Sequence, residues 1–180
     1  MIIINLKGGL GNQMFQYALG YVLAKKKNCT LLCDIRLQEF YKKNPPPRNV
    51  PREIDLDAFG IKIKQPNNWL LFKVLQNFSN YRLRKYIIII LDFFGVLASR
   101  ERKRVFEKRI FDNKSINLYI DGYWQSEKYF IDYKKDIFKI FNFSNLKNES
   151  KNVSFFKSIN LNNCVCLNVR RLDFLNNPEH

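Results

Sequence analysis

The sequence contains a single histidine, His180, at its last position. A histidine general base or a histidine-rich metal site is therefore excluded for the rest of the chain. The four cysteines lack the Cys-x-x-Cys spacing of zinc sites and stand in apolar, strand-like surroundings: Cys29, Cys33, Cys164 and Cys166. We expect neither a bound metal nor a disulfide framework in a chain this apolar.

Acidic residues are scarce, with 16 Asp and Glu against 31 Lys and Arg, so the net charge is +15. Such an excess attracts nucleic acid, phosphate-bearing substrates or acidic membrane surfaces. An abundance of Lys, Asn, Ile and Phe, typical of an AT-rich genome, offers a simpler source of the same charge. No nucleic-acid-reading motif accompanies the basic stretch Arg100–Arg109. We therefore expect no nucleic-acid partner.

Long apolar runs are also missing. The longest, Tyr86–Ala98, is interrupted by Asp92 and Gly95, and a membrane span needs roughly 20 apolar residues. The first residues lack the charged leader of a signal peptide, so the sequence predicts a cytoplasmic protein. The apolar run next to Arg100–Arg109 is a candidate surface for weak association with anionic lipid at the inner face of the membrane; a buried helix with a solvated end is the alternative.

The order of apolar segments predicts an α/β fold, a Rossmann-like parallel sheet with flanking helices. Residues 2–6 and 30–35 are continuous runs typical of buried strands, and residues 118–121 supply a third strand. Apolar residues at helical spacing predict helices at about 12–26 and 126–140. A helix between two such strands is typical of a parallel β-α-β unit.

The rest of the chain divides the protein into two parts. Residues 65–109 predict a helical insertion, and a polar stretch precedes another apolar, strand-like segment at 163–169. We therefore expect a Rossmann-like domain at 1–150. Residues 151–180 would form a linker and the start of a second domain.

A glycine cluster lies between the first strand and the first helix. Glycines there let backbone N–H groups approach an anion, and the helix N-terminus adds a partial positive charge; a tight turn without a ligand is the alternative. The turn matches the glycine fingerprint of dinucleotide-binding proteins poorly, because Met14 occupies the third glycine position. Asp34, at the end of the second strand, is still a candidate to bind a nucleotide ribose. The candidate substrate-binding residues of this turn are Gly8, Gly9, Gly11, Asn12 and Gln13.

Two further patterns concern sugars and metals. Trp124 and Gln125 follow the strand at 118–121 and could stack on and hydrogen-bond a sugar, with core packing as the alternative for Trp124. Asp55 and Asp57 have the Asp-x-Asp spacing of some metal-dependent sugar transferases. They lie in an amphipathic stretch, and we reject the metal role.

Four stretches, in the same order along the chain, resemble the α-1,2-fucosyltransferases of glycosyltransferase family 11. They are Gly8–Ala18 (Gly-Gly-Leu-Gly-Asn-Gln-Met-Phe-Gln-Tyr-Ala), Arg52–Phe59, Asp121–Phe130 and Leu167–Phe174. The last resembles the family's His-x-Arg-Arg-Gly-Asp-Tyr motif. Asn168, Leu172 and Phe174 depart from it at the His, Gly and Tyr positions.

The resemblance implies transfer of L-fucose from GDP-fucose to a galactose hydroxyl in an α-1,2 linkage, inverting and metal-independent, for surface glycan synthesis. It implies a fold of two Rossmann-like domains (GT-B type), with no cofactor beyond the donor. The partners implied are the nucleotide sugar and a galactoside acceptor glycan. Arg170 and Arg171 would be the catalytic pair that neutralises the departing diphosphate, with Asp173 as a further substrate contact.

The family continues beyond the arginine motif, so we expect this sequence to be its amino-terminal portion, truncated there, with the second domain mostly missing. A non-enzymatic remnant is the alternative, favoured by Asn168 and Leu172. A leucine at a position that needs a left-handed backbone would be strained by about 1–2 kcal/mol. Donor turnover by the 180-residue chain distinguishes the two.

Overall fold

A computed structural model describes residues 1–45, 52–66, 97–101 and 105–143, together with the single positions 163, 165 and 167. These residues contain a parallel sheet of four strands in the order β2-β1-β4-β3. The strands are β1 (Ile2–Asn5), β2 (Leu31–Asp34), β3 (Leu97–Arg100) and β4 (Leu118–Asp121). The predicted α/β class with a parallel sheet is therefore confirmed.

Strand β1 is central because its isoleucines are apolar on both faces of the sheet. Ile2, Ile3 and Ile4 are fully buried, as expected for a strand covered on both sides. Ile2 is in register with Leu31 of β2 on one side and with Leu118 of β4 on the other. Of the three strands predicted from the sequence, β2 and β4 thus each pair with β1, and β3 adds a fourth strand beyond β4.

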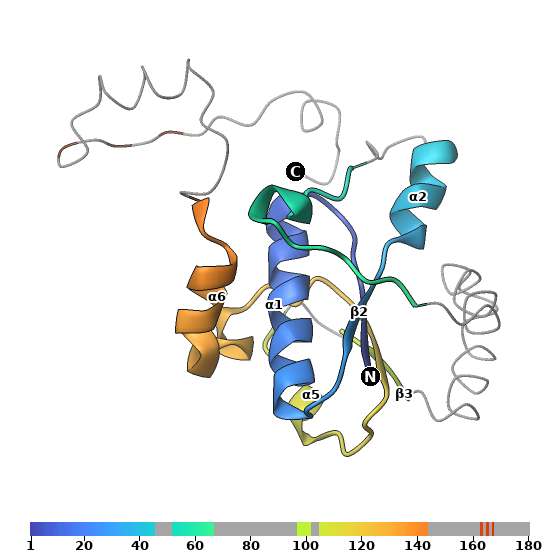
Figure 1. The fold of residues 1–180 in the computed structure, drawn as a ribbon, viewed down its shortest axis with the longest axis vertical. Coiled ribbons are helices and arrows are strands. Elements are labelled where there is room, and N and C mark those ends of the chain that lie inside the picture. The colour runs from blue at the N-terminus through green and yellow to red at the C-terminus, as the bar shows by residue number, and fades with distance from the viewer. Residues whose placement is uncertain are drawn as a thin grey trace.

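Helix α1 (Leu10–Lys26) runs alongside the strands and packs on β1 and β2, as Figure 1 shows. Gly20 allows this close approach, because a Cβ there would lie 2.8 Å from the Leu31 Cδ1 atom of β2. Lys25 and Lys26 occupy the last turn, where positive charge suits the helix dipole. The helix predicted at about 12–26 is confirmed.

Shorter helical segments follow the first two strands. Helix α2 (Arg36–Lys43) comes directly after β2, and the turn η1 (Leu56–Phe59) buries Leu56 and Phe59 in the core. Helix α5 (Arg109–Asp112) precedes β4. Beyond η1 the chain passes the outer edge of β2, where the Cys33 N–H donates to the Lys64 carbonyl.

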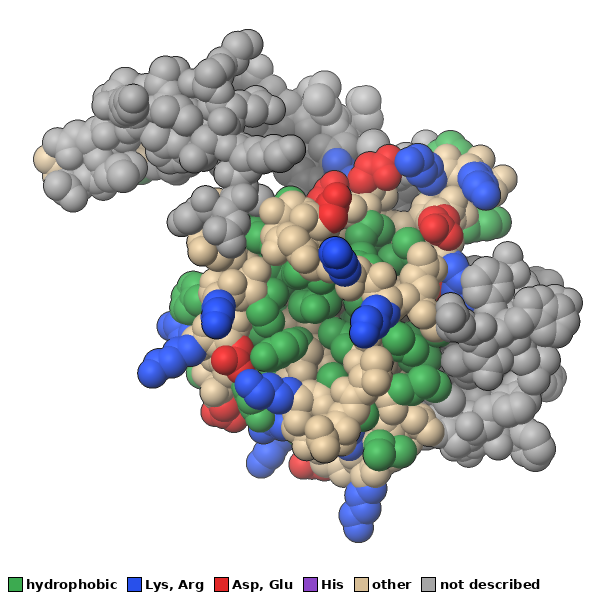
Figure 2. Space-filling view, in the orientation of Figure 1, with side chains coloured by type: hydrophobic (Ala, Val, Ile, Leu, Met, Phe, Trp, Pro, Cys, Tyr) green, Lys and Arg blue, Asp and Glu red, His purple; other side chains and the backbone are tan. Residues whose placement is uncertain are grey.

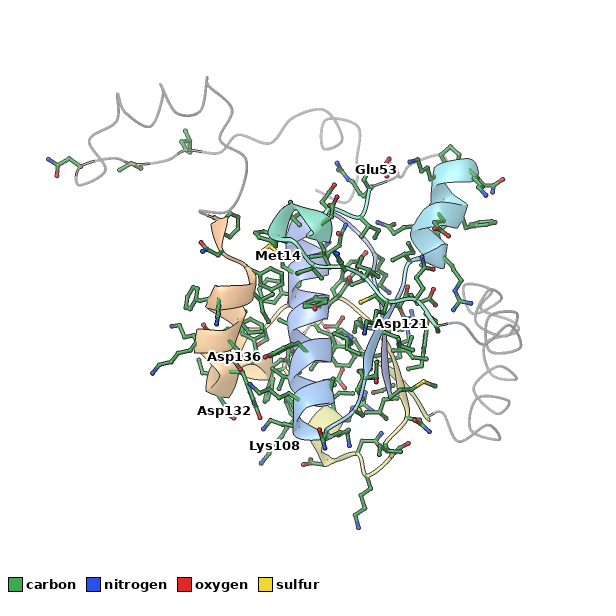
Figure 3. All side chains as sticks on the ribbon, in the orientation of Figure 1. Met14, Glu53, Lys108, Asp121, Asp132 and Asp136 are labelled. Atoms are coloured by element: carbon green, nitrogen blue, oxygen red, sulfur yellow. The ribbon has the colours of Figure 1, made fainter. Side chains whose placement is uncertain are left out.

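The helix predicted at 126–140 is only partly correct. The chain instead forms two short 3₁₀ turns, η2 (Glu127–Tyr129) and η3 (Ile131–Tyr133), before α6 (Lys134–Ile140). Phe130 stands between the turns at φ −136°, ψ 16°, outside the helical region, so the first half is not one continuous helix. Helix α6 lies beside α1 (Figure 1), and Asp136 reaches from α6 to Lys25 and Tyr21 of α1 (Figure 3).

The helical insertion predicted at 65–109 is wrong at 97–100. These residues form β3, because their backbone pairs with that of β4 over four positions. Residues 67–96 lie outside the described residues, and with them most of the candidate membrane surface.

Of the strand predicted at 163–169, only positions 163, 165 and 167 are described. They lie outside any strand, and the side chains of Val165 and Leu167 are 97% and 84% exposed. These three positions do not form the predicted buried strand, and the other positions of 163–169 lie outside the described residues.

On the face drawn in Figure 2, the charge of the described residues is dispersed. Figure 2 shows lysine and arginine side chains spread among other residues on one face rather than gathered into a single patch. Aromatic side chains join the elements beneath: Phe141, which follows α6, contacts Phe59 of η1 and Tyr17 of α1, with ring centroids 5.2 and 6.1 Å apart.

Candidate functional site

The carboxyl ends of all four strands meet at one edge of the sheet. Ligands of open α/β sheets bind outside this edge, because the loops that follow the strands gather there. Two loops are of interest: the glycine turn after β1, residues 7–9, and the loop after β4, residues 122–125. They carry most of the site residues predicted from the sequence that the structure describes.

The glycine turn has a backbone that only glycine adopts easily. Gly8 has φ +78°, and a Cβ there would lie 2.4 Å from the Asn12 Nδ2 atom. Gly9 is the N-cap of α1 and offers no side chain to the first helical N–H groups; nothing lies within 4 Å of a Cβ at Gly9 or Gly11. The first turn of α1 contains no acidic residue. The amino-terminal end of α1 therefore presents backbone N–H groups that no side chain caps, and these groups carry a partial positive charge.

Gln13 is predicted as a substrate contact, but the structure buries it completely. Its Nε2 donates to the Gly8 and Glu53 carbonyls at 2.9 and 2.7 Å, and its Oε1 accepts the Asp55 N–H at 3.0 Å. Gln13 therefore fastens the segment after residue 52 to the glycine turn, and its role as a substrate contact stays a prediction.

A second buried amide, Gln16, is absent from the sequence-based predictions. Its Oε1 accepts the Lys7 N–H at 3.0 Å, and its Nε2 donates to the Lys7 and Gly122 carbonyls at 3.2 and 3.1 Å. Gln16 thus holds the turn after β1 against the loop after β4. Its place on the sheet-facing side of a helix is the one sequence signal, because a polar residue there needs a partner.

Trp124 is fully buried and packs edge-to-face on Tyr129, with ring centroids 5.6 Å apart. This burial fits core packing, the alternative given for Trp124 from the sequence, and a contact between Trp124 and a sugar stays a prediction. The backbone of Trp124 has φ +55°, an unfavourable region for a bulky residue. The loop therefore holds an unusual conformation that its neighbours must support.

Asn12 and Gln125 remain at the surface and contact each other across the two loops. The Gln125 Nε2 atom donates to Asn12 Oδ1 at 2.6 Å. Asn12 is partly buried in the first turn of α1, and Gln125 is exposed after β4. The sequence predicts both as substrate-binding residues, and the structure places them side by side.

A buried carboxylate, Asp121, ends β4 between these loops. Its Oδ1 accepts from Asn5 Nδ2 at 3.0 Å and from Lys7 Nζ at 2.5 Å. The Arg100 Nε atom lies 3.6 Å from Oδ2, and 53% of its side chain is exposed. The ammonium of Lys7 also lies 5.3 Å from the centre of the Tyr123 ring. This group brings two cations to the edge of the sheet around one buried carboxylate.

Asp34, at the end of β2, is closed off. Its Oδ1 accepts from Arg36 Nε at 2.5 Å, and its Oδ2 accepts from Arg36 Nη2 at 2.5 Å and from the Tyr119 hydroxyl at 3.1 Å. Burial, and then the nearby Asp34 charge, raises the pKa of Tyr119 well above its usual value. Both carboxylate oxygens are occupied, so Asp34 has no place for a ribose.

Metal ligands and the arginine motif complete the set of predicted positions. Within the described residues, no three His, Cys, Asp or Glu side chains gather as a metal site. Asp55 and Asp57 are both exposed around η1. Arg170, Arg171 and Asp173 lie outside the described residues and stay predictions. In the same part of the chain, no helix is long and apolar enough to cross a membrane.

Two curated proteins of Escherichia coli are similar to this chain over nearly its whole length. An alpha-1,2-colitosyltransferase is 28% identical over 179 residues, which cover 99% of this chain and 57% of the relative. The chain is a distant homologue of glycosyltransferases. An O-antigen biosynthesis glycosyltransferase, WbnK, is 27% identical over 186 residues, which cover 97% of this chain and 60% of the relative.

This glycosyltransferase homologue therefore spans somewhat more than half the length of each relative. No family model matches the chain, and no solved structure does. The similarity runs through both loops of the candidate site, because it covers nearly all residues of the chain.

Proposed function

We propose that this chain carries the first domain of a glycosyltransferase that moves L-fucose from GDP-fucose to a galactose hydroxyl in an α-1,2 linkage, for surface glycan synthesis. The observation that carries the proposal is the match to an alpha-1,2-colitosyltransferase over 99% of the chain. The motifs that resemble fucosyltransferases support the same linkage. A two-domain, GT-B arrangement is part of this proposal.

The donor sugar is the point on which the resemblance and the relative differ. Colitose is L-fucose without its 3-hydroxyl group, so the two sugars share every other group that a site could contact. A site built to hydrogen-bond a hydroxyl rejects the analogue lacking it strongly, whereas a site without such a contact accepts both. GDP-fucose and GDP-colitose are therefore the two donors to compare.

The proposed chemistry is an inverting transfer without a metal. The galactose oxygen attacks the anomeric carbon from the face opposite GDP, the bond to the diphosphate breaks, and the hydroxyl proton leaves to solvent or a base. Positive groups then stabilise the leaving diphosphate. Arg170 and Arg171 are proposed for this task, because a guanidinium is permanently charged and matches phosphate oxygens in pairs.

The described loops would contribute the other side of the site. The uncapped N-terminus of α1 and the glycine turn offer backbone N–H groups at the strand ends. Lys7 and Arg100 add positive charge around Asp121 at the same edge. Asn12 and Gln125 supply amide groups suited to sugar hydroxyls.

A transfer assay tests the proposal. The 180-residue chain would be incubated with radiolabelled GDP-fucose or GDP-colitose and a β-galactoside, with the E. coli alpha-1,2-colitosyltransferase as positive control. An α-1,2-linked product that falls about 10²–10³-fold in Arg170→Ala or Arg171→Ala would support it. Product from neither donor, alongside an active control, would favour the inactive remnant that Asn168 and Leu172 suggest.

A further inference from the structure

The loop after β4 is held by a carboxylate from the neighbouring strand. Glu101 follows β3, and its Oε2 accepts the Tyr123 N–H at 2.7 Å, while its Oε1 accepts the Trp124 N–H at 3.2 Å. Successive backbone N–H groups that point at one anion form a nest. Here the anion is part of the protein itself. The carboxylate therefore fixes the backbone of two consecutive loop residues.

The loop adopts a conformation that needs such support. Trp124 has a left-handed φ of +55°, and Gly122 has φ +157°. A Cβ at Gly122 would lie 2.5 Å from the Cβ of Glu101, so the missing side chain lets Glu101 approach. The Glu101 N–H also donates to the Asp121 carbonyl at 2.9 Å, which continues the pairing of β3 with β4.

The consequence of this support is the position of Gln125, the next residue along the loop. Its Nε2 reaches Asn12 Oδ1 at 2.6 Å, across the gap between the loop and α1. That bond leaves the Gln125 Oε1 acceptor and the Asn12 Nδ2 donors to serve a ligand. A sugar hydroxyl both donates and accepts a hydrogen bond, and the adjacent amides offer the matching pair.

We propose that Glu101 is the positioning residue of a sugar-hydroxyl subsite formed by Asn12 and Gln125. The proposal rests on the proposed function, which supplies two sugars with suitable hydroxyls: the galactoside acceptor and the fucosyl group of the donor. Glu101 touches neither sugar. It acts by holding the Trp124 backbone, and through it the side chain of Gln125.

Ligand titrations followed by NMR on the 180-residue chain test this subsite. Methyl β-D-galactopyranoside, GDP-fucose and GDP are titrated separately into the parent chain, Gln125→Ala, Glu101→Gln and the double variant. Gln65→Ala and Glu39→Gln replace exposed residues elsewhere and serve as matched controls. Thermal unfolding of each variant reports the stability of the fold separately.

We expect Gln125→Ala to weaken one of the two sugar ligands about tenfold, the size of a lost pair of hydrogen bonds, and to leave GDP unchanged. Weaker galactoside identifies an acceptor subsite, and weaker GDP-fucose identifies a donor subsite. Glu101→Gln should weaken the same ligand about three- to tenfold. In the Gln125→Ala background it should change the affinity less than about twofold, because residues that act as a unit are not additive.

Several outcomes overturn the subsite. They are multiplicative effects in the double variant, equal losses in the control variants, and failure of both sugar ligands to bind the parent chain. If Glu101→Gln does not fold, Glu101→Asp keeps the charge and must retain more affinity than Glu101→Ala. Transfer that proceeds normally in Gln125→Ala would refute this subsite and leave the proposed function standing. Absence of both binding and transfer would refute the two together.

Discussion

Asp34 and Asp121 are buried aspartates that end β2 and β4, the two strands on either side of β1. Their surroundings differ. Asp34 is neutralised within three residues of chain by Arg36, whose side chain is only 8% exposed. Asp121 takes its partners from other strands and loops: Asn5, Lys7 and Arg100. The side chains of its two cations are 20% and 53% exposed. We call the carboxyl end of β2 at Asp34 the sealed end, because its cation is buried. The carboxyl end of β4 at Asp121 is the open end, because its cations are partly exposed to solvent.

The difference shows which end of the sheet is free for a ligand. The carboxylate oxygens of Asp34 are occupied by Arg36 and Tyr119, so Asp34 stabilises the fold and has no acceptor left for a ligand. A carboxylate that gathers cations from separate loops keeps those loops together and leaves part of the positive charge accessible. The candidate site therefore lies between β1 and β4, where Asn12 and Gln125 also meet.

The largest expected effect comes from breaking the sealed end. Arg36→Ala leaves Asp34 buried beside Tyr119 without its cation, and we expect a loss of about 3–5 kcal/mol in the free energy of unfolding. Lys7→Ala should cost less, about 1–2 kcal/mol, because Asp121 keeps Asn5 and Arg100. Urea denaturation measures both.

The surface pair between Lys42 and Glu53 provides the control for this comparison. Both side chains are more than half exposed, so Lys42→Ala should change the free energy of unfolding by less than about 0.5 kcal/mol. Equal losses in Arg36→Ala and Lys7→Ala would show that the two strand ends do not differ in the way described.

The next effect concerns the amide that joins the two open loops. Gln16→Ala removes three hydrogen bonds to the backbone groups of Lys7 and Gly122. We expect a loss of about 2–3 kcal/mol, because buried backbone groups are left without partners. Urea denaturation gives the loss, and hydrogen exchange of the Lys7 amide should accelerate. A change below about 0.5 kcal/mol would mean that the two loops are not held by this residue.

The glycine turn should respond less strongly. Gly8→Ala places a Cβ at φ +78° and 2.4 Å from Asn12 Nδ2, and we expect a loss of about 1–2 kcal/mol. Gly11→Ala is the matched control, since a Cβ there meets nothing within 4 Å. It should be neutral or stabilise α1 by up to about 1 kcal/mol in thermal unfolding. The same loss in both variants would remove the special role of Gly8.

The smallest effect is the pH dependence of the sealed end. Burial, with Asp34 nearby, raises the pKa of the Cys33 thiol to about 12 from 9.0. The pKa of Tyr119 is raised as well. Above pH 9 the unfolded chain loses these protons while the folded chain keeps them, so stability falls as pH rises.

At pH 10 the Cys33 contribution to this fall amounts to about 1 kcal/mol. Cys33→Ala and Tyr119→Phe should each flatten the decline of the unfolding free energy between pH 9 and 11. Denaturation curves recorded at half-unit intervals measure the slope. An unchanged slope in both variants would contradict the assignment.

The sequence predicts β1, β2 and β4 well and the edge strand β3 poorly. The isoleucines of β1 are buried on both faces of the sheet. The continuous apolar run of β2 is also typical of a strand, although Leu31 and Leu32 are only partly buried. Strand β3 reads Leu-Ala-Ser-Arg, and its extended form depends on pairing with β4. No local pattern contains that information, which explains the predicted helix there.

The candidate site, too, could be predicted from the sequence only where local residues determine it. Glycine and amide residues at the turn after β1 are visible in the sequence, and Asn12 and Gln125 do meet. The roles of the buried amides are not visible, because Gln13 and Gln16 bond backbone groups whose positions depend on the whole fold. Burial of Trp124 likewise follows from a backbone turn that Glu101 holds from another strand.

The central position of β1 has a consequence for how the protein is made. Its partner on one side, β2, follows within about thirty residues, but Leu118 of β4 pairs with Ile2 from 116 residues away along the chain. At a synthesis rate of about 5–20 residues per second, one edge of β1 waits roughly 6–23 s for its second neighbour. Until then the nascent chain exposes a strand edge with three consecutive isoleucines, so this interval is when the protein is most open to aggregation and to chaperones.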